Sequence, residues 1–334
     1  MRILVFDVPA ERGGALTILE QYYEKAIVDS KNEWIFVISK PELESKKNVK
    51  IINYPWVKKS WMHRLIFDIF VAHKLVSKYN IDEVISLQNI LIPNITVKQT
   101  LYVHQSLPFI DYKFRFLENK SLWIYQNIIG NLIYMSVKKA DCILVQTNWM
   151  KNACLKKINV DGNKILVVTP EIGINVMRHF KHSEDSIRTF FYPAGASYYK
   201  NHRIIVDAFN KLNAKGIDNI KVIFTLKGNE NAHIAELYET TKLCQLNINF
   251  IGSLTKEEVF NHYSKSVLIF PSYIETFGLP LLEAKMHNTP ILASDCEFSH
   301  EILEDYNKVD FFNPFDSTDL VSKIIELIKN KSND

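Results

Sequence analysis

Two glutamates with seven residues between them, Glu275 and Glu283, flank a glycine turn in the second half of the chain. The apolar run Val267–Phe270 before them predicts a short buried strand. Pro280 suits the first position of a helix that continues to about residue 286, because its fixed φ matches the helix and its missing N–H costs nothing there. The two carboxylates therefore lie on either side of a strand–turn–helix junction.

The start of this predicted helix is an anion site. We expect the amides of Gly278 and Leu279 to be unpaired and to point outward, where the helix dipole favours negative charge. Carboxylates aimed at a phosphate would repel it, so both are better placed to accept from hydroxyl groups. We assign Glu283 to a ribose and Glu275 to a sugar, which together describe a nucleotide-sugar. The alternative is a solvated helix start with two chance glutamates.

A lysine follows a second strand-and-turn pattern. Residues 189–192 predict a strand, Gly195 permits a tight turn, and Lys200 stands just ahead of a helix predicted over 204–212. There an ammonium group reaches a diphosphate held beside the sheet. Gly228 marks the turn after the next predicted strand, over 220–226. A surface lysine that only flanks a helix is the alternative for Lys200.

The first half offers two further candidates. A strand over 2–8, apolar except for Arg2 and Asp7, is followed by a glycine pair that ends at Gly14, and glycines there let the backbone approach a ligand closely. This is not the G-x-G-x-x-G fingerprint, and a tight strand-to-helix turn explains it equally well. His104 follows a strand predicted over 100–103, at the edge where open α/β sheets bind ligands. A structural histidine is the alternative.

Glu275-x7-Glu283, with Phe277-Gly278-Leu279-Pro280 inside it, resembles the signature of the retaining glycosyltransferases of family 4, also called glycosyltransferase group 1. The resemblance implies an α/β chain of GT-B fold. Two Rossmann-like domains would face each other across a cleft, with a C-terminal helix returning to the first domain.

The resemblance also implies roles for individual residues and for ligands. Lys200, Glu275 and His104 would be the catalytic group, with His104 meeting the donor sugar. The donor would be a nucleotide-sugar, with UDP- or GDP-sugars expected, and the acceptor a glycan or a lipid-linked glycan. No metal is required. The residues expected to contact the donor are Gly14, Gly195, Lys200, Gly228, Thr276, Phe277, Gly278, Leu279 and Glu283.

One feature departs from the family pattern. Most similar enzymes carry an arginine shortly after the strand that precedes the lysine. This chain has Ala or Ser in that interval and no arginine. Arg12 or Arg203 would have to substitute, or the diphosphate would depend on Lys200 and backbone amides alone.

The length of 334 residues suggests two domains of ordinary size. We expect an acceptor-side domain over 1–172, a nucleotide-sugar domain over 187–318, and a C-terminal helix and tail over 319–334. Charge differs between the halves. Residues 1–170 hold 23 Lys and Arg against 15 Asp and Glu, and the remainder holds 17 against 22. The basic half favours an anionic partner.

Aromatic and basic residues gather between residues 54 and 79. Leu65, Ile69, Ala72 and Val76 recur at helical spacing, so we expect them to face the core. The others have the composition of a surface that touches an anionic membrane, and a solvated helix is the alternative. These others are Trp56, Lys58, Lys59, Trp61, His63, Arg64, Phe67, Phe70, Lys74 and Lys78.

Four cysteines without C-x-x-C spacing indicate reduced thiols. With no predicted signal segment or membrane span, we expect a cytoplasmic protein, with peripheral contact at the inner face of the cell membrane if the basic surface binds lipid.

Our sequence-based hypothesis is a glycosyltransferase of bacterial surface-polysaccharide assembly, for capsule or O-antigen. Two alternatives are a non-catalytic GT-B binding or stabilising partner and a sugar-nucleotide epimerase. Nucleic acid is not an expected partner, because no recognition-helix or base-stacking pattern accompanies the basic residues.

Overall fold

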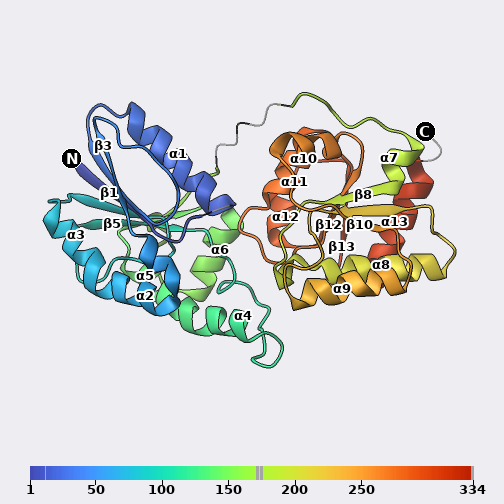
Figure 1. Ribbon diagram of the computed structural model, residues 1–334, viewed down its shortest axis with the longest axis horizontal. Helices are drawn as coiled ribbons and strands as arrows, with labels where there is room; N and C mark the ends of the chain where they lie inside the picture. Colours follow the sequence, from blue (N-terminus) through green and yellow to red (C-terminus); the bar gives the residue numbers. More distant parts are fainter. Residues whose placement is uncertain (12, 171–172, 174–175, 332–334) are drawn as a thin grey trace. The chain divides into compact units, whose positions relative to one another are not determined.

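The computed structural model describes residues 1–11, 13–170, 173 and 176–331. It divides into two compact units, Met1–Ile172 and Gly173–Asp334. Each unit is a parallel β-sheet with helices on both faces (Figure 1), which confirms the predicted α/β class. In the described part of the chain, no helix is both long and apolar enough to cross a membrane.

The first unit has a seven-stranded sheet in the order β3-β2-β1-β4-β5-β6-β7, and the paired strands run parallel. Near-continuous apolar strands of this kind need cover on both faces. The strands are β1 Arg2–Asp7, β2 Glu33–Ile38, β3 Val49–Asn53, β4 Glu83–Ser86, β5 Lys98–Val103, β6 Cys142–Val145 and β7 Ile165–Val167.

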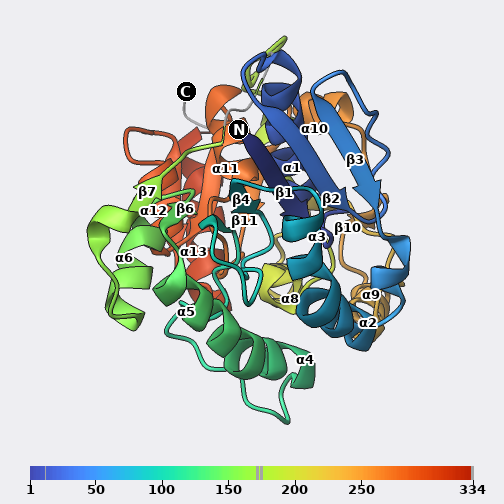
Figure 2. The ribbon, with the colours of Figure 1, turned by 90° about the vertical axis from the view of Figure 1, so that its left-hand side faces the viewer.

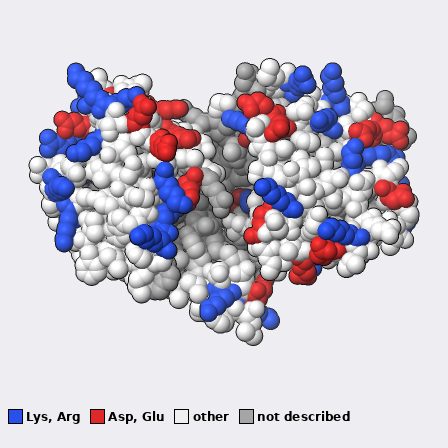
Figure 3. Space-filling model, in the orientation of Figure 1, with Lys and Arg blue, Asp and Glu red and all other residues white. Residues whose placement is uncertain are grey.

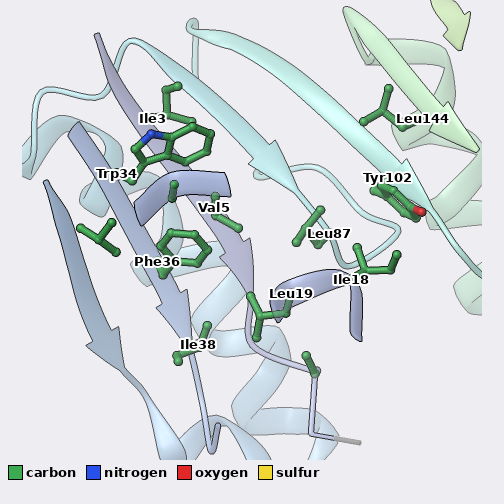
Figure 4. Close-up of a cluster of buried hydrophobic side chains, with 13 residues drawn as sticks. Ile3, Val5, Ile18, Leu19, Trp34, Phe36, Ile38, Leu87, Tyr102 and Leu144 are labelled. Carbon is green, nitrogen blue, oxygen red and sulfur yellow. The ribbon is translucent and has the colours of Figure 1, made fainter. Parts of the chain in front are cut away.

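One face of this sheet is covered by α1 (Gly14–Val28). Figure 4 shows Ile18 and Leu19 of this helix over Val5 of β1 and Phe36 of β2. The other face carries the helices between β3 and β4 and those between β5 and β6, which lie below the sheet in Figures 1 and 2. These and the remaining helical segments are η1 Pro55–Lys59, α2 Trp61–Ile66, η2 Phe67–Val71, α3 Ala72–Lys78, α4 Lys120–Ile124, η3 Tyr125–Ile129, α5 Gly130–Lys139, α6 Asn148–Lys157 and η4 Gly162–Lys164.

The helix after β3 corrects one prediction. Ala72 and Val76 are buried as expected, but Leu65 and Ile69 are exposed, and Phe67 takes the place in the core. The reason is η2, a turn of π-helix in which the Ala72 amide donates to the Phe67 carbonyl, five residues back. The extra residue in this turn rotates the residues before it relative to α3, so a constant helical spacing chooses the wrong face.

The second unit has a six-stranded parallel sheet in the order β10-β9-β8-β11-β12-β13. Its strands are β8 Thr189–Tyr192, β9 Lys221–Phe224, β10 Ile248–Phe250, β11 Val267–Phe270, β12 Ile291–Ser294 and β13 Val309–Phe312. Its helical segments are α7 Glu184–Arg188, η5 Tyr198–Lys200, α8 His202–Ala214, α9 Ala232–Leu243, α10 Lys256–Tyr263, α11 Leu279–Met286, α12 Glu297–Ile302 and α13 Ser317–Lys331.

The chain enters this unit along its surface, where the Phe180 amide donates to the His287 carbonyl and the Lys181 amide to the Ser264 carbonyl. At the other end, α13 packs against α8 and α7. Both elements that frame the predicted site, β8 and β11, are central and buried throughout.

Candidate active site

The strand order of the second unit has a switch point between β8 and β11. From β8 the chain runs outward through β9 and β10, and then returns to the other side of β8 as β11, so the crossovers on either side of β8 and β11 run in opposite directions. Open α/β sheets bind ligands at such a switch point. The turns that follow β8 and β11 contain Lys200 and Glu275.

Lys200 and Glu275 meet directly there. The Lys200 ammonium donates to Glu275 Oε1, and the Ser272 hydroxyl donates to the same oxygen at 2.7 Å. The lysine and glutamate side chains are 20% and 16% exposed, so the pair is partly desolvated yet open to a ligand. An ammonium has three donors, and a carboxylate has two oxygens. Both groups therefore keep hydrogen-bonding capacity for a third molecule.

Hydrogen bonds from neighbouring side chains fix the backbone around Lys200. The buried Tyr192 hydroxyl, at the end of β8, donates to the Lys200 carbonyl at 2.7 Å. Burial, and to a smaller extent the negative charge of Glu275, raises the pKa of Tyr192 well above its usual value. This hydroxyl therefore stays protonated and remains a donor. Asn201 follows in the left-handed region, with φ of 60°. Its side-chain amide donates to the Pro271 carbonyl at 3.4 Å and to the Pro314 carbonyl at 2.7 Å, so one residue joins the turns after β8, β11 and β13.

At the start of α11 the amides of Gly278 and Leu279 lack a side-chain cap, and of these two residues Leu279 is partly exposed while Gly278 is buried. Gly278 is the N-cap with φ of 80°, and no side chain caps this end within the described chain. The Leu281 amide bonds to the Gly278 carbonyl, and Pro280 has no N–H, which leaves the amides of Gly278 and Leu279 for a ligand. Pro280 is the second helical residue rather than the first. A Cβ on Gly278 would approach Leu281 Cδ1 to 3.2 Å.

Glu283 lies one turn into α11 and is buried. Its Oε2 accepts from the Tyr263 hydroxyl at 3.1 Å. Burial raises the pKa of the Glu283 carboxyl to about 7, although Tyr263 and Lys256 act to lower it. At neutral pH the group is therefore poised between its neutral and ionised forms.

The predicted glycines differ in what surrounds them. A Cβ on Gly14 or Gly195 would meet no atom of the described residues within 4 Å, which leaves space for a ligand there as far as the described chain shows. Gly228 is different. A Cβ there would lie 2.7 Å from Tyr238 Cγ, and its amide already donates to Glu230 at 3.1 Å. Packing against Tyr238 thus accounts for this glycine without a ligand.

The two residues between Glu275 and Gly278 have unlike settings. Phe277 is buried, whereas Thr276 is half-buried. The residues that the structure brings together at this edge are Lys200, Glu275, Thr276, Phe277, Gly278, Leu279 and Glu283.

His104 and Gly14 belong to the first unit. His104 follows β5 directly and is partly buried, and its amide donates to Asn89 Oδ1 at 2.8 Å. Burial lowers the pKa of the imidazole to about 4, so it is neutral at pH 7 and able to hydrogen-bond a sugar hydroxyl.

Of the two arginines considered for the diphosphate, Arg203 forms an ion pair with Glu236 at 2.8 Å. Arg12 lies outside the described residues. Within the described chain, no group of three His, Cys, Asp or Glu residues is arranged to hold a metal ion.

Sequence reasoning did not find Ser272, Tyr192, Asn201 or Tyr263. Ser272 had a local signal, because it stands three residues before Glu275 in the same turn. Tyr263 had none, since it contacts a residue 20 positions away in a different helix.

Known structures share the fold over almost the whole chain. Sucrose-phosphate synthase from Thermosynechococcus elongatus has a TM-score of 0.74 at 15% identity, covering 99% of this chain and 90% of that one. HepE from Anabaena, in complex with UDP and glucose, has a TM-score of 0.70 at 15% identity, covering 99% and 91%. The lipopolysaccharide outer core galactosyltransferase WaaB has a TM-score of 0.69, again at 15% identity and with 99% and 91% covered. The chain therefore has the GT-B fold of glycosyltransferases.

Sequence comparison points to the same class of protein. The model described as "Glycosyl transferases group 1" matches residues 177–334, which include β8, β11 and α11. The O-antigen chain mannosyltransferase RfbU of Salmonella typhimurium is 26% identical over 261 residues, which are 78% of this chain and 69% of RfbU. The chain thus resembles the glycosyltransferases of group 1 in sequence and shares their fold, and the resemblance seen in the sequence is confirmed.

Proposed function

We propose that this glycosyltransferase moves a sugar from a UDP- or GDP-sugar to a glycan or lipid-linked acceptor, with retention of anomeric configuration and without a metal ion. A role in bacterial surface-polysaccharide assembly, for O-antigen or capsule, is supported by similarity to the mannosyltransferase RfbU. A nucleotide-sugar donor is supported by the shared fold with HepE, whose structure holds UDP and glucose.

The observation that carries this proposal is the Lys200–Glu275 pair beside the open amides of Gly278 and Leu279. Each part suits a different piece of the donor. Lys200 and the two amides bind the diphosphate and stabilise the charge that develops when it leaves. Glu275 accepts from a hydroxyl of the transferred sugar, and ionised Glu283 accepts from the ribose.

In the proposed reaction the bond between the anomeric carbon and the phosphate oxygen breaks. An acceptor hydroxyl bonds to the same face of that carbon, and its proton passes to a departing phosphate oxygen. The protein therefore supplies charge stabilisation rather than a base. Electrostatic groups aimed at developing charge contribute about 10²–10³ in rate each.

The test is Lys200→Met with a panel of nucleotide-sugars and lipid-linked acceptors. We expect kcat to fall by about 10²–10³ with the melting temperature unchanged within a few degrees. Lys215→Met is the matched control, since Lys215 is an exposed lysine at the end of α8. Wild-type turnover in Lys200→Met would remove the lysine from the reaction, and an inverted anomer by NMR would end the proposal of retention.

A second candidate, a non-catalytic GT-B binding partner, is favoured by one observation, the lack of the family's arginine after β8. Calorimetry with UDP and GDP, combined with the transfer assay above, separates the two functions. Nucleotide binding without transfer to any acceptor would support the binding partner, and conversion of the donor sugar without acceptor would indicate an epimerase.

A further inference from the structure

The first unit carries exposed apolar side chains on two neighbouring helices. We call them the apolar face. On α2–η2 they include Phe70, which is 58% exposed, and on η3–α5 they include Ile128 and Met135, which are 54% and 53% exposed. The full set is Met62, Leu65, Ile66, Ile69, Phe70, Ile128, Leu132 and Met135.

Four of these residues, Leu65, Ile69, Leu132 and Met135, line one groove. This groove of about 580 Å³ runs between the two helices, with Leu65 and Ile69 on one wall, Leu132 and Met135 on the other, and residues 90–97 among its lining. Figure 3 shows the lower part of the first unit as a largely uncharged surface with Lys and Arg near its edges. Exposed apolar surfaces rimmed by polar residues mark interaction sites.

The charges around the apolar face are mainly positive, although Asp68 and Asp141 also line the groove. Residues 54–79 contain five Lys and Arg against one acidic residue, and residues 112–139 again contain five against one. The acidic Asp68 is neutralised by Arg64 at 2.6 Å. Lys74 lies about one turn after Phe70, and Lys139 lies one turn after Met135. Neither of these lysines has an ion pair with any described residue.

The structure also shows which predicted membrane residues are not available. Phe67 is buried, and Trp56 packs against it with ring centroids 5.7 Å apart. The Lys58 ammonium donates to the Pro9 carbonyl at 2.6 Å and pairs with Glu11. The Trp61 side chain lies outside the described residues. Apart from Phe70, which was predicted to face a membrane, the apolar residues of the surface are ones that helical spacing had placed in the core or that the sequence reasoning had not named.

We propose that the apolar face docks on an anionic lipid bilayer. Its side chains enter the boundary between headgroups and acyl chains while the surrounding lysines bind the lipid phosphates. Charge decides between a bilayer and a protein partner. With Lys58 and the Arg64–Asp68 pair set aside, these segments keep eight basic residues against one acidic residue, and this excess matches the negative potential of an anionic leaflet. The inference does not depend on the proposed sugar transfer, since binding is measured without donor or acceptor.

The experiment is co-sedimentation of the full chain with vesicles of phosphatidylglycerol and phosphatidylcholine, and with phosphatidylcholine alone. We expect binding to the anionic vesicles that weakens with salt, and little binding to the neutral ones. A lysine near an anionic surface strengthens binding about fivefold, so changing Lys59, Lys74, Lys120 and Lys138 to Gln should weaken it several hundredfold.

Two further variants separate charge from insertion. Changing Met62, Ile66, Phe70 and Met135 to Ser keeps the charge, and we expect it to weaken binding at least about tenfold. The matched control changes four exposed lysines outside these segments, Lys25, Lys31, Lys47 and Lys215, to Gln, and should bind like the wild type.

Three results would overturn the proposal. An equal loss of vesicle binding in the control variant would show that only the net charge of the protein matters. Full vesicle binding by the serine variant would exclude insertion of the apolar side chains into the bilayer. A dimer in solution that the serine variant dissociates would assign the apolar face to a second copy of the chain.

Discussion

We expect the ionised Glu283 carboxylate to lower the free energy of unfolding and to strengthen donor binding. Replacing Glu283 with glutamine tests both effects. Burial beside Tyr263 raises the pKa of its carboxyl from 4.5 to about 7. The group ionises near 4.5 in the unfolded chain and near 7 in the folded one, so the free energy of unfolding falls as the pH rises from about 4.5 through 7. At about 1.4 kcal/mol for each pH unit between the two pKa values, ionisation costs the fold about 3 kcal/mol at pH 8 and under about 1 kcal/mol at pH 5.

Glu283→Gln removes the charge but keeps an oxygen that accepts from the Tyr263 hydroxyl. We expect the variant to be about 2–3 kcal/mol more stable than the wild type at pH 8 and nearly equal to it at pH 5. The affinity for UDP or GDP should fall in this variant, although its stability rises. A hydrogen bond to an ionised group contributes about 1.5–3 kcal/mol, so losing it raises Kd about 10- to 100-fold.

Hydrogen exchange of the α11 amides at pH 5 and pH 8, corrected for the intrinsic exchange rate, measures the local stability. The chain provides an internal control, because all five tryptophans lie in the first unit, and their fluorescence should follow a transition that the variant does not shift. Glu304→Gln, at an exposed glutamate of the second unit, removes a charge without burial. Lower stability of Glu283→Gln at pH 8, or protection in the wild type that does not change between the two pH values, would refute the reasoning.

Three other expectations concern the same edge of the sheet. Tyr192→Phe removes the hydroxyl that holds the Lys200 carbonyl, and should cost about 1 kcal/mol in thermal unfolding and lower kcat more than it changes KM; an unchanged kcat would mean that Lys200 needs no such support. Gly228→Ala should destabilise the second unit by several degrees in melting temperature, because the methyl group collides with Tyr238, whereas Gly195→Ala should leave the melting temperature unchanged and weaken donor binding. Treatment with EDTA should leave the transfer rate unchanged, and recovery of a lost rate by Mg²⁺ or Mn²⁺ would contradict the proposed mechanism.

Local patterns predicted much of the candidate site. Residues 267–286 form a strand, a glycine turn and a helix as expected, since the apolar run, Gly278 and Pro280 each act within a few residues. Alternating strands and helices likewise predicted two parallel sheets, because parallel strands need crossover connections.

Contacts between distant segments were not predictable in this way. The ion pair between Lys200 and Glu275 joins residues 75 positions apart, and it depends on β8 and β11 being neighbours. The raised pKa of Glu283 depends on burial against Tyr263, which no spacing shows. The π-turn at Phe67–Val71 had no signal in the apolar pattern, and a regular helical period therefore placed Leu65 and Ile69 in the core.

That π-turn has a genetic counterpart. It holds one residue more than an α-turn, so loss of a single codon within 67–71 would restore a regular α-helix. The segment before it would rotate by about 100° around the helix axis, so side chains such as Met62 and Ile66 would no longer lie on the solvent-facing side of the helix. Insertion or deletion of one residue here would thus change, in evolution, whether the apolar side chains of this helix face solvent. The β-sheet that the helix covers would stay unchanged.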